Sequence, residues 1–480
     1  MFSVIFFASM ACLGIGLIVK TVVDNTGLFD DSYYKTHRRI SWTEYGLGAV
    51  LACLIVVPGV TIVGTNIAKD GLLEFDEFWN GYETAALVSN NNCTRDGSCR
   101  FEYDCDSYNH IHTSTSTDSN GNTQTHISNH THWHRCPYAT SETTYKVATT
   151  LDEFTIDTTI DDDARAWRAG RGIPGDYPKG VPAFWQAAAD RLAAGDPGPV
   201  TVQRTYDNYV LAAQNTILDK YDGDIDAYLA DDLLPDTSME RGLHSYYRGH
   251  KVHSMGVPVG DLAEWEFAVD RFNAALGTDL QGDLHLVFVP AEVNGDRYAG
   301  SLNAYWTGDT FGDQALSKNA IVVIVGVEAG EIAWSESFTG MPVGNELMLT
   351  RLSDLAGTAL TPDDLLGRPV GIIADGDVDE IQHTEGAIES AVWATDRPFE
   401  RICMTCDDPD ENGGYGYLAG DVEPTTGQKW GIFAVALLMS SLVWAVFIAV
   451  GNHYEGGSGE SRGRGSNGSR RTNPGRPSIY

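Results

Sequence analysis

The residues with the clearest chemical potential in this sequence are eight cysteines and a cluster of histidines. Cys12 and Cys53 lie inside long apolar runs, which leaves an even set of six cysteines elsewhere. An even set in an oxidising compartment is typical of disulfide bonds, whereas thiolates are also good ligands for metal ions. These six candidates, for disulfide bonds or for metal coordination, are Cys93, Cys99, Cys105, Cys136, Cys403 and Cys406.

The first four of these cysteines bracket a segment that is poor in apolar residues. Cys93, Cys99 and Cys105 recur at intervals of six, and Cys136 closes the segment. A bond across the 31-residue stretch from Cys105 to Cys136 would stabilise the fold by about 3 kcal/mol in the chain-entropy model. Spacing alone does not determine which cysteines pair, so we expect a disulfide-stapled segment without assigning its bonds.

Histidines gather in the same segment, where six of the chain's 13 lie between positions 110 and 134. Alternate residues of a β-strand share one face, and a hairpin turned at residues 118–121 would bring the two groups of histidines together. Imidazoles on one face suit zinc or copper, and clustered histidines also suit a pH sensor. The leading interpretation is a disulfide-stapled hairpin with solvated histidines. The alternative is a metal site with ligands His110, His112, His130, His132 and His134.

A second group of candidate ligands precedes the last apolar run. Cys403 and Cys406 form a CxxC pair, which suits half a zinc site, a redox pair or a tight disulfide. The acidic stretch 408–413 places oxygens at alternate positions before a glycine, as in the first half of a calcium loop. Ala419 stands where such a loop has its bidentate glutamate, so an acidic turn is the leading interpretation. The calcium ligands under the alternative are Asp408, Asp410 and Asn412.

No catalytic signature accompanies these candidates. The sequence contains no P-loop, no GxSxG, no HExxH and no GxGxxG pattern, and its carboxylates are too numerous for one acid/base pair to stand out. The formal net charge of −34 argues against nucleic acid as a partner of the main domain, because phosphate binding requires clustered lysine and arginine. We therefore predict no catalytic residue, and the cofactors in question are zinc or calcium.

Three apolar runs are long enough to cross a membrane. Residues 2–19, 45–68 and 430–450 contain no charged side chain, and a helix of about 20 residues spans a hydrocarbon core of about 30 Å. The sequence therefore predicts three transmembrane helices and membrane lipid as a partner. Their predicted bounds are 1–23, 45–68 and 430–450.

Lysine and arginine near these runs predict the orientation. Four basic residues lie between the first two apolar runs, within residues 20–44, and five lie in the tail 451–480, so both segments should be cytoplasmic. The N-terminus and residues 69–429 would then be extracytoplasmic. Without the cytoplasmic segments, 23 basic and 60 acidic residues remain, a net charge of −37. The tail is rich in Gly, Ser and Arg, which predicts disorder.

The extracytoplasmic part divides by composition and periodicity. Apolar residues at helical spacing predict a helical stalk, and alternation within 141–160 predicts strands. Alternating helices and strands after residue 261 predict an α+β fold with an α/β-like layer. The predicted segments are the stalk 69–89, a Cys/His-rich β-hairpin insert 90–160, a helical region 161–254, an α/β domain with an extension 255–400, and a Cys/Asp-rich linker 401–429.

Several segments of this layer follow the pattern of a known small module. They are 284–289, 298–299, Trp306, 318–324, 331–334 and 339–340. Through these segments, residues 262–352 resemble the TPM domain family. The resemblance implies a small α/β module, often tethered to membranes, and some members are phosphatases or metal binders. The family's glycine-rich turn after the last strand is altered here at 340–346. The whole layout also resembles membrane proteins of phage and prokaryotic genomes.

Two functions from different classes follow from these features. The first is a membrane-anchored extracytoplasmic interaction or structural module with a protein partner. The second is a membrane-tethered, metal-dependent hydrolase of the phosphatase type, which the TPM resemblance implies. A concave site where carboxylates converge would favour the second.

Overall fold

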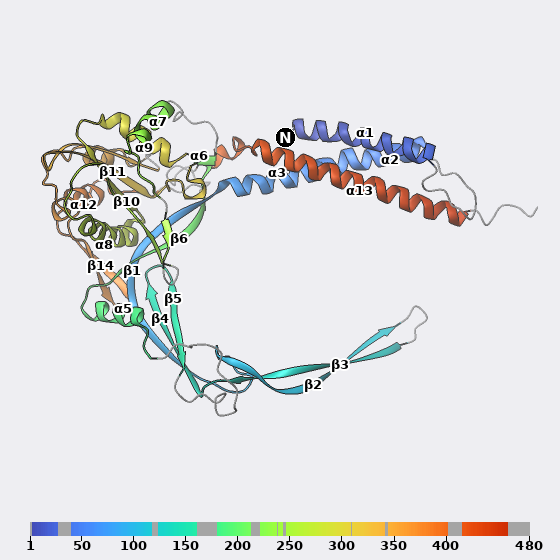
Figure 1. Cartoon of the computed structure of the whole chain (residues 1–480), viewed down its shortest axis with the longest axis horizontal. Helices are drawn as coiled ribbons and strands as arrows, with labels where there is room; N and C mark the ends of the chain where they lie inside the picture. The colour runs from blue at the N-terminus through green and yellow to red at the C-terminus, as the bar shows by residue number, and fades with distance from the viewer. Residues whose placement is uncertain are drawn as a thin grey trace, which may run out of the picture. The chain divides into compact units, whose positions relative to one another are not determined.

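The structure, a computed structural model, contains a mixture of helices and sheets (Figure 1). Its contacts divide the chain into two compact units, residues 1–72 with 422–480, and residues 73–421. The structure describes residues 2–26, 40–117, 123–160, 180–212, 221–237, 239–242, 246–308, 310–340, 344–401 and 415–458.

The first unit contains three helices that are long and apolar enough to cross a membrane. They correspond to the three predicted spans, and each is longer than expected. The last helix continues eight residues into the predicted tail, to Ser458. The first is α1 (Phe2–Thr26), the second is built from α2 (Trp42–Val50), η1 (Leu51–Val56) and α3 (Val57–Leu73), and the third is α13 (Thr426–Ser458).

Local sequence explains how the second of these helices begins and bends. The Ser41 hydroxyl accepts from the Glu44 backbone N–H, and the Glu44 carboxylate accepts from the Ser41 N–H, which is a capping box. Pro58 has no N–H to continue the helical ladder. One π-helical turn, η1, lies directly before it, and the Val57 N–H donates to the Ala52 carbonyl. A membrane helix tolerates such a local adjustment.

Trp444 of α13 packs between the other two helices of this unit. Its ring carbons occupy the space that a Cβ atom would need at Gly16 and at Gly48, so no larger residue fits at either position. The same ring stacks on Tyr45 with centroids 5.4 Å apart. Small residues that allow close approach are typical of packing between membrane helices.

The second unit begins with an antiparallel sheet of strand order β5-β4-β1-β6. Its longest strand, β1, pairs with β6 through its first half and with β4 through its second half. Helix α5 packs on this sheet through Phe184, Trp185 and Ala188. The strands are β1 (Glu74–Asn92), β4 (Ser141–Thr149), β5 (Glu153–Ile160) and β6 (Pro199–Asp207), and the helix is α5 (Ala183–Ala193).

The helical stalk predicted for residues 69–89 is wrong beyond Leu73, because residues 74–89 belong to β1. Both faces of the strand are buried between Asp76 and Thr84, so its charged residues there point inward and obscure the alternation that marks a strand. Glu77 and Glu83 are almost fully buried and pair with Arg401 and Arg191 at 2.7 and 2.6 Å. These partners are distant in sequence and could not be predicted from local periodicity.

A second sheet has the strand order β12-β11-β10-β9, with three parallel strands and β12 antiparallel at one edge. Parallel neighbours need crossover connections, and one helix follows each of the first two strands. Ala329 and Gly330, which join β11 to β12, both have positive φ, as a tight two-residue hairpin turn requires. The elements are β9 (Val252–Ser254), α8 (Leu262–Leu280), β10 (Asp283–Pro290), α9 (Gly295–Trp306), β11 (Ala320–Glu328) and β12 (Glu331–Thr339).

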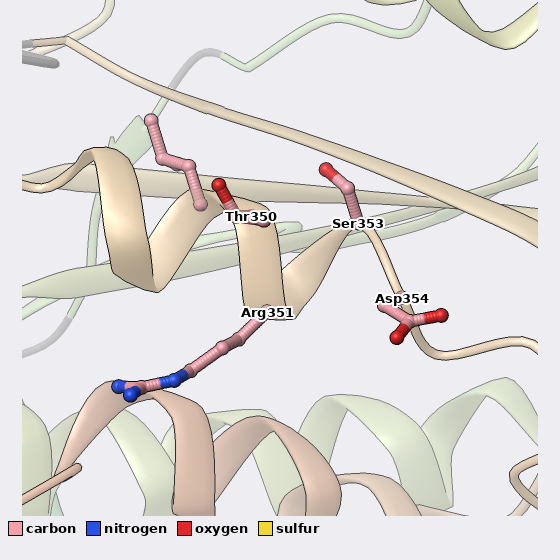
Figure 2. A pocket seen from close by; sticks show the side chains of 5 residues that line it. Thr350, Arg351, Ser353 and Asp354 are labelled. Atoms are coloured by element: carbon pink, nitrogen blue, oxygen red, sulfur yellow. The ribbon is translucent and has the colours of Figure 1, made fainter.

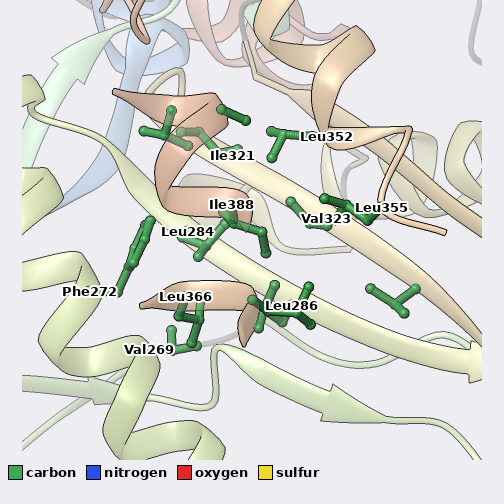
Figure 3. Close-up of a cluster of buried hydrophobic side chains, with 14 of the residues drawn as sticks. Val269, Phe272, Leu284, Leu286, Ile321, Val323, Leu352, Leu355, Leu366 and Ile388 are labelled. Carbon is green, nitrogen blue, oxygen red and sulfur yellow. The ribbon is translucent and has the colours of Figure 1, made fainter. Parts of the chain in front are cut away.

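Both faces of this second sheet are buried. On one face, Leu284 and Leu286 pack with Phe272 of α8 (Figure 3). On the other, Val287 packs with Trp306 of α9. The result is a three-layer arrangement of helix, sheet and helix. Its central strands are mainly apolar, as expected for buried parallel strands, although Asp283 and His285 stand at the start of β10.

The helical region predicted for 161–254 is wrong in part, because residues 199–207 form β6 and strands occur again after residue 238. The α/β domain also begins before residue 255, since β9 belongs to its sheet and Leu234 packs in the same core. Likewise, 141–160 belongs to the first sheet and not to the hairpin insert. The remaining elements are α6 (Tyr209–Ala212), α7 (Asp222–Ala230), β7 (Met239–Arg241), β8 (Tyr247–Gly249), η4 (Gly312–Gln314), α10 (Glu346–Leu352), α11 (Pro362–Leu366), β13 (Val370–Ala374), β14 (Asp377–Gln382), α12 (Ala387–Val392) and η5 (Gly416–Gly420).

Candidate functional site

The predicted Cys/His-rich hairpin is present as a long two-stranded ribbon (Figure 1). Strands β2 (Glu102–Thr117) and β3 (Thr123–Pro137) pair antiparallel from Glu102 opposite Pro137 to Thr117 opposite Thr123, with one bulge between Asp104 and Ser107. The predicted turn at 118–121 lies outside the described residues. Side chains beyond the base of the ribbon are exposed on both faces, so the ribbon has no core of its own.

Four of the predicted cysteines form two disulfide bonds. Cys93 is bonded to Cys99 and Cys105 to Cys136, which confirms the disulfide interpretation for these four and supplies the pairing that spacing left open. The two bonded sulfurs of Cys93 and Cys99 lie near Glu142, but bonded sulfurs are not thiolate ligands. Glu142 instead accepts hydrogen bonds from the backbone of residues 100 and 101.

The strand register places the histidines on one face of the ribbon. His110 lies opposite His130, and Tyr108 lies opposite His132. One ring nitrogen from each of His110, His112 and His132 lies within 4.8 Å of the other two. His130 is close by, with its ring centroid 5.5 Å from that of His112. Four of the five predicted histidine ligands therefore lie together.

The fifth predicted ligand, His134, is turned to another partner. Its Nδ1 lies 2.5 Å from Oδ2 of Asp96, a residue of the loop that the Cys93–Cys99 bond closes. The backbone N–H of Arg135 and this His134 contact hold the pKa of Asp96 below its usual range. His134 therefore fixes the base of the ribbon. The other histidines of the ribbon make no comparable hydrogen bond within the described residues.

The opposite face of the ribbon carries three large apolar residues among polar ones. Three residues that alternate with the histidines along the two strands point to this face. They are Ile111, Ile127 and Trp133, which are 61%, 71% and 54% exposed. Single exposed apolar residues are ordinary, but an isolated ribbon with three large ones on a single face is a candidate contact surface.

The second group of predicted ligands lies outside the described residues. This group comprises Cys403, Cys406, Asp408, Asp410 and Asn412.

The sequence did not reveal a buried polar cluster that joins the two sheets of the second unit. The Lys251 ammonium lies 2.6 Å from Oδ1 of Asp283, and their side chains are only 3% and 2% exposed. Asn80 of β1 donates to the same carboxylate oxygen at 2.9 Å and accepts from Lys251 at 2.9 Å. Burial opposes the ionisation of Asp283, but the neighbouring Lys251 and His285 hold its pKa well below the usual range.

Two histidines complete this cluster on the face of the sheet that α9 covers. His285 Nε2 lies 3.2 Å from Oδ2 of Asp283, and the rings of His285 and His253 lie 5.8 and 5.9 Å from that of Trp306. His285 Nδ1 and His253 Nε2 have no hydrogen-bond partner within the described part of the chain. Burial, with the charges of His285 and His250, lowers the pKa of His253 to about 3. We interpret the cluster as structural, because its polar and charged groups are buried and bond to one another.

His253 predicts a loss of stability in mild acid. The folded protein keeps this imidazole neutral, whereas the unfolded chain protonates it below about pH 6.5, so the stability it confers is complete above that pH and is lost towards pH 3. Near pH 5 the loss is about 2 kcal/mol. We expect His253→Leu to reduce the difference between denaturant melts at pH 7 and pH 5, while exposed His126→Gln leaves it unchanged. Equal pH dependence in both variants would contradict this assignment.

A shallow hollow lies at the C-terminal end of α10, lined by Leu349 and the four residues labelled in Figure 2. Arg351 extends away from Asp354 and binds both carboxylate oxygens of Asp396 at 2.9 and 2.8 Å. Burial and the neighbouring Asp296 raise the pKa of Glu336. A hydrogen bond from Ser353, which lines the hollow, lowers this pKa and partly offsets the rise. The labelled lining residues are Thr350, Arg351, Ser353 and Asp354.

Comparison with known proteins adds no assignment to these sites. No family model, curated protein or solved structure matches the chain.

Proposed function

We propose that the protein is a membrane-anchored, extracytoplasmic interaction module, and that the disulfide-stapled β2–β3 ribbon is the arm that contacts a protein partner. Three large apolar side chains exposed on one face of the ribbon, those of Ile111, Ile127 and Trp133, are the single observation that carries this proposal. Tryptophan is enriched among the residues that contribute most binding energy at an interface, and a partner that covered these side chains would remove them from water.

The construction of the ribbon supports this role. A two-stranded hairpin is marginally stable by itself in water, and this one has exposed side chains on both faces along most of its length. Two disulfides at its base compensate for the missing core. A rigid arm loses less conformational entropy on binding than a mobile loop of the same length, which favours recognition.

Charge and disulfides support the extracytoplasmic side. Basic residues flank the predicted cytoplasmic ends of the three helices, as the positive-inside rule requires. Disulfide bonds persist in oxidising compartments and are rare in the cytosol. Both observations favour residues 69–429 outside the cytoplasm, with the N-terminus on the same side and the C-terminal tail in the cytoplasm.

The resemblance of residues 262–352 to TPM domains supports a tethered module for the rest of the unit. A sheet with parallel β9, β10 and β11 between α8 and α9 is compatible with the small α/β module that the family implies. In this proposal it is a rigid support from which the arm extends.

Site-specific photocrosslinking in membranes of producing cells tests the function. A photoreactive amino acid at Ile127 should yield one defined crosslinked protein species. Trp133→Ser in the same chain should reduce its yield at least about tenfold, since truncation of a hot-spot residue costs about 2 kcal/mol or more. The same probe at exposed Asp379 of β14 is the matched control. Equal crosslinking from Asp379, or none from Ile127, would contradict the proposal.

A membrane-tethered hydrolase of the phosphatase type is the second candidate, and the shallow hollow beside Asp354 favours it. Glu336 and Asp296 form a carboxyl pair close to Ser353, and such pairs can hold a metal ion or transfer a proton. The purified full chain should then hydrolyse p-nitrophenyl phosphate with Mg²⁺, and Asp354→Asn should abolish turnover. Activity that persists in Asp354→Asn, or no activity in the wild type, would remove this candidate.

A further inference from the structure

We infer that the histidine face of the β2–β3 ribbon is a binding site for a divalent transition-metal ion, with His110, His112 and His132 as the ligands and zinc as the ion that fits best. This site is on the opposite face from the apolar residues of the proposed arm, so it does not depend on the partner-binding function.

The strand pairing brings the three imidazoles together. His110 and His112 alternate along β2 and share a face, and their ring centroids are 4.4 Å apart. His132 comes from β3, and its ring lies 5.6 Å from that of His110. The ring nitrogens of His110, His112 and His132 lie within 4.8 Å of one another. The nitrogens around a zinc ion, with Zn–N bonds of about 2.0–2.1 Å, lie closer together than this, so a small rotation of the exposed side chains completes the site.

The scaffold limits how far these side chains can separate. The Cys105–Cys136 bond fixes the register of the two strands at their base, and ladder pairing continues beyond the histidines to Thr117 opposite Thr123. Tyr108 stacks on His132 with centroids 5.6 Å apart and restricts the orientation of that ring. A prearranged set of ligands binds an ion more tightly than ligands on a mobile loop.

The donor set selects the class of ion. Three neutral imidazoles without a carboxylate suit zinc, copper or nickel and do not suit calcium or magnesium, which prefer oxygen ligands. Three protein ligands leave the fourth position of a tetrahedral zinc ion for a water molecule or for His130, the next nearest imidazole. Surface exposure makes the site accessible to ions from solution.

Titration of the purified full chain in detergent, with its disulfides intact, tests the site. We expect one equivalent of Zn²⁺ after desalting, and a Co²⁺ adduct with the intense visible absorption of tetrahedral coordination. Mutation of a residue that only hydrogen-bonds to a metal ligand typically lowers metal affinity about 10- to 100-fold. Loss of a ligand itself, in His110→Gln or in His132→Gln, should therefore weaken Zn²⁺ binding at least that much. His130→Gln should have a smaller effect.

His126→Gln is the matched control, because His126 is exposed on the same face of β3 but lies opposite Ser114, beyond the three ligands. Its Zn²⁺ affinity should stay within about twofold of the wild type. Loss of binding in this variant equal to that in His132→Gln would show nonspecific histidine binding and overturn the proposal. So would the absence of stoichiometric Zn²⁺, or binding that survives the His110→Gln/His132→Gln double variant. Crosslinking from Ile127 reports separately on the partner-binding face.

Discussion

Asp283→Asn is expected to destabilise the second unit by about 3–5 kcal/mol, the usual result of removing one partner from a buried ion pair. The substitution preserves the size of the side chain but leaves the Lys251 ammonium, which is 3% exposed, without its counter-charge. Asn80 would remain as a neutral partner of Lys251 and could not replace the lost charge. The measurement is a chemical-denaturation midpoint of the full chain in detergent, followed by near-UV circular dichroism of its tryptophans.

The matched control is Asp363→Asn, which removes the carboxylate from an exposed ion pair with Arg368. Exposed pairs contribute about 0–1 kcal/mol, so this variant should melt close to the wild type. A double variant, Lys251→Met with Asp283→Leu, should recover much of the loss, because an apolar pair can replace a buried ion pair at little cost. If Asp283→Asn melts like Asp363→Asn, the buried pair is not a determinant of stability.

The cluster around Asp283 marks the limit of what the sequence could predict. Lys251 and Asp283 are 32 positions apart, and Asn80 lies about 170 positions before Lys251. Local periodicity predicts the strand that begins at Asp283, but it predicts helix around Asn80 and Lys251 and does not show which strands become neighbours. The one available signal was chemical, since Asp283 and His285 interrupt the start of an apolar strand, and buried charges in such places need partners.

The ribbon was more predictable because its chemistry is local. Alternation placed His130 and His132 on one face, and the pairing of β2 with β3 brings His110 opposite His130 as expected. The cysteines predicted disulfides, but their pairing depends on the geometry of the loop between Cys93 and Cys99. His134 was assigned as a ligand from spacing alone, and its contact with Asp96 could not be anticipated because it crosses that loop.

Strand β1 shows the opposite case, in which periodicity misled. Phe75, Phe78 and Tyr82 recur at helical spacing, yet they lie in a strand that is covered on both faces. A strand covered on both faces does not need to alternate apolar with polar residues. Its charged residues are satisfied by distant arginines, such as Arg191 with Glu83. Helix and strand can therefore be distinguished here only by tertiary contacts.

Loss of the Cys105–Cys136 bond should release the ribbon while leaving the globular part folded. We expect Cys105→Ser with Cys136→Ser to lower the local stability of β2 and β3 by about 3 kcal/mol, because the bond closes a 31-residue loop and the ribbon has little buried surface to replace it. Amides in the paired strands should then exchange about 100-fold faster, as measured by hydrogen–deuterium exchange with mass spectrometry.

Cys93→Ser with Cys99→Ser is the matched control, because it removes a bond of the same type that closes only six residues. Its chain-entropy contribution is about 2 kcal/mol, and its effect should be confined to the loop that holds Asp96 and to the adjacent base of the ribbon. The inferred metal site gives a second readout, since Zn²⁺ affinity should fall in the Cys105/Cys136 variant more than in the control. Unchanged exchange in β2 and β3 would mean that strand pairing alone maintains the arm. In that case the disulfide would not be what keeps the three histidines in register.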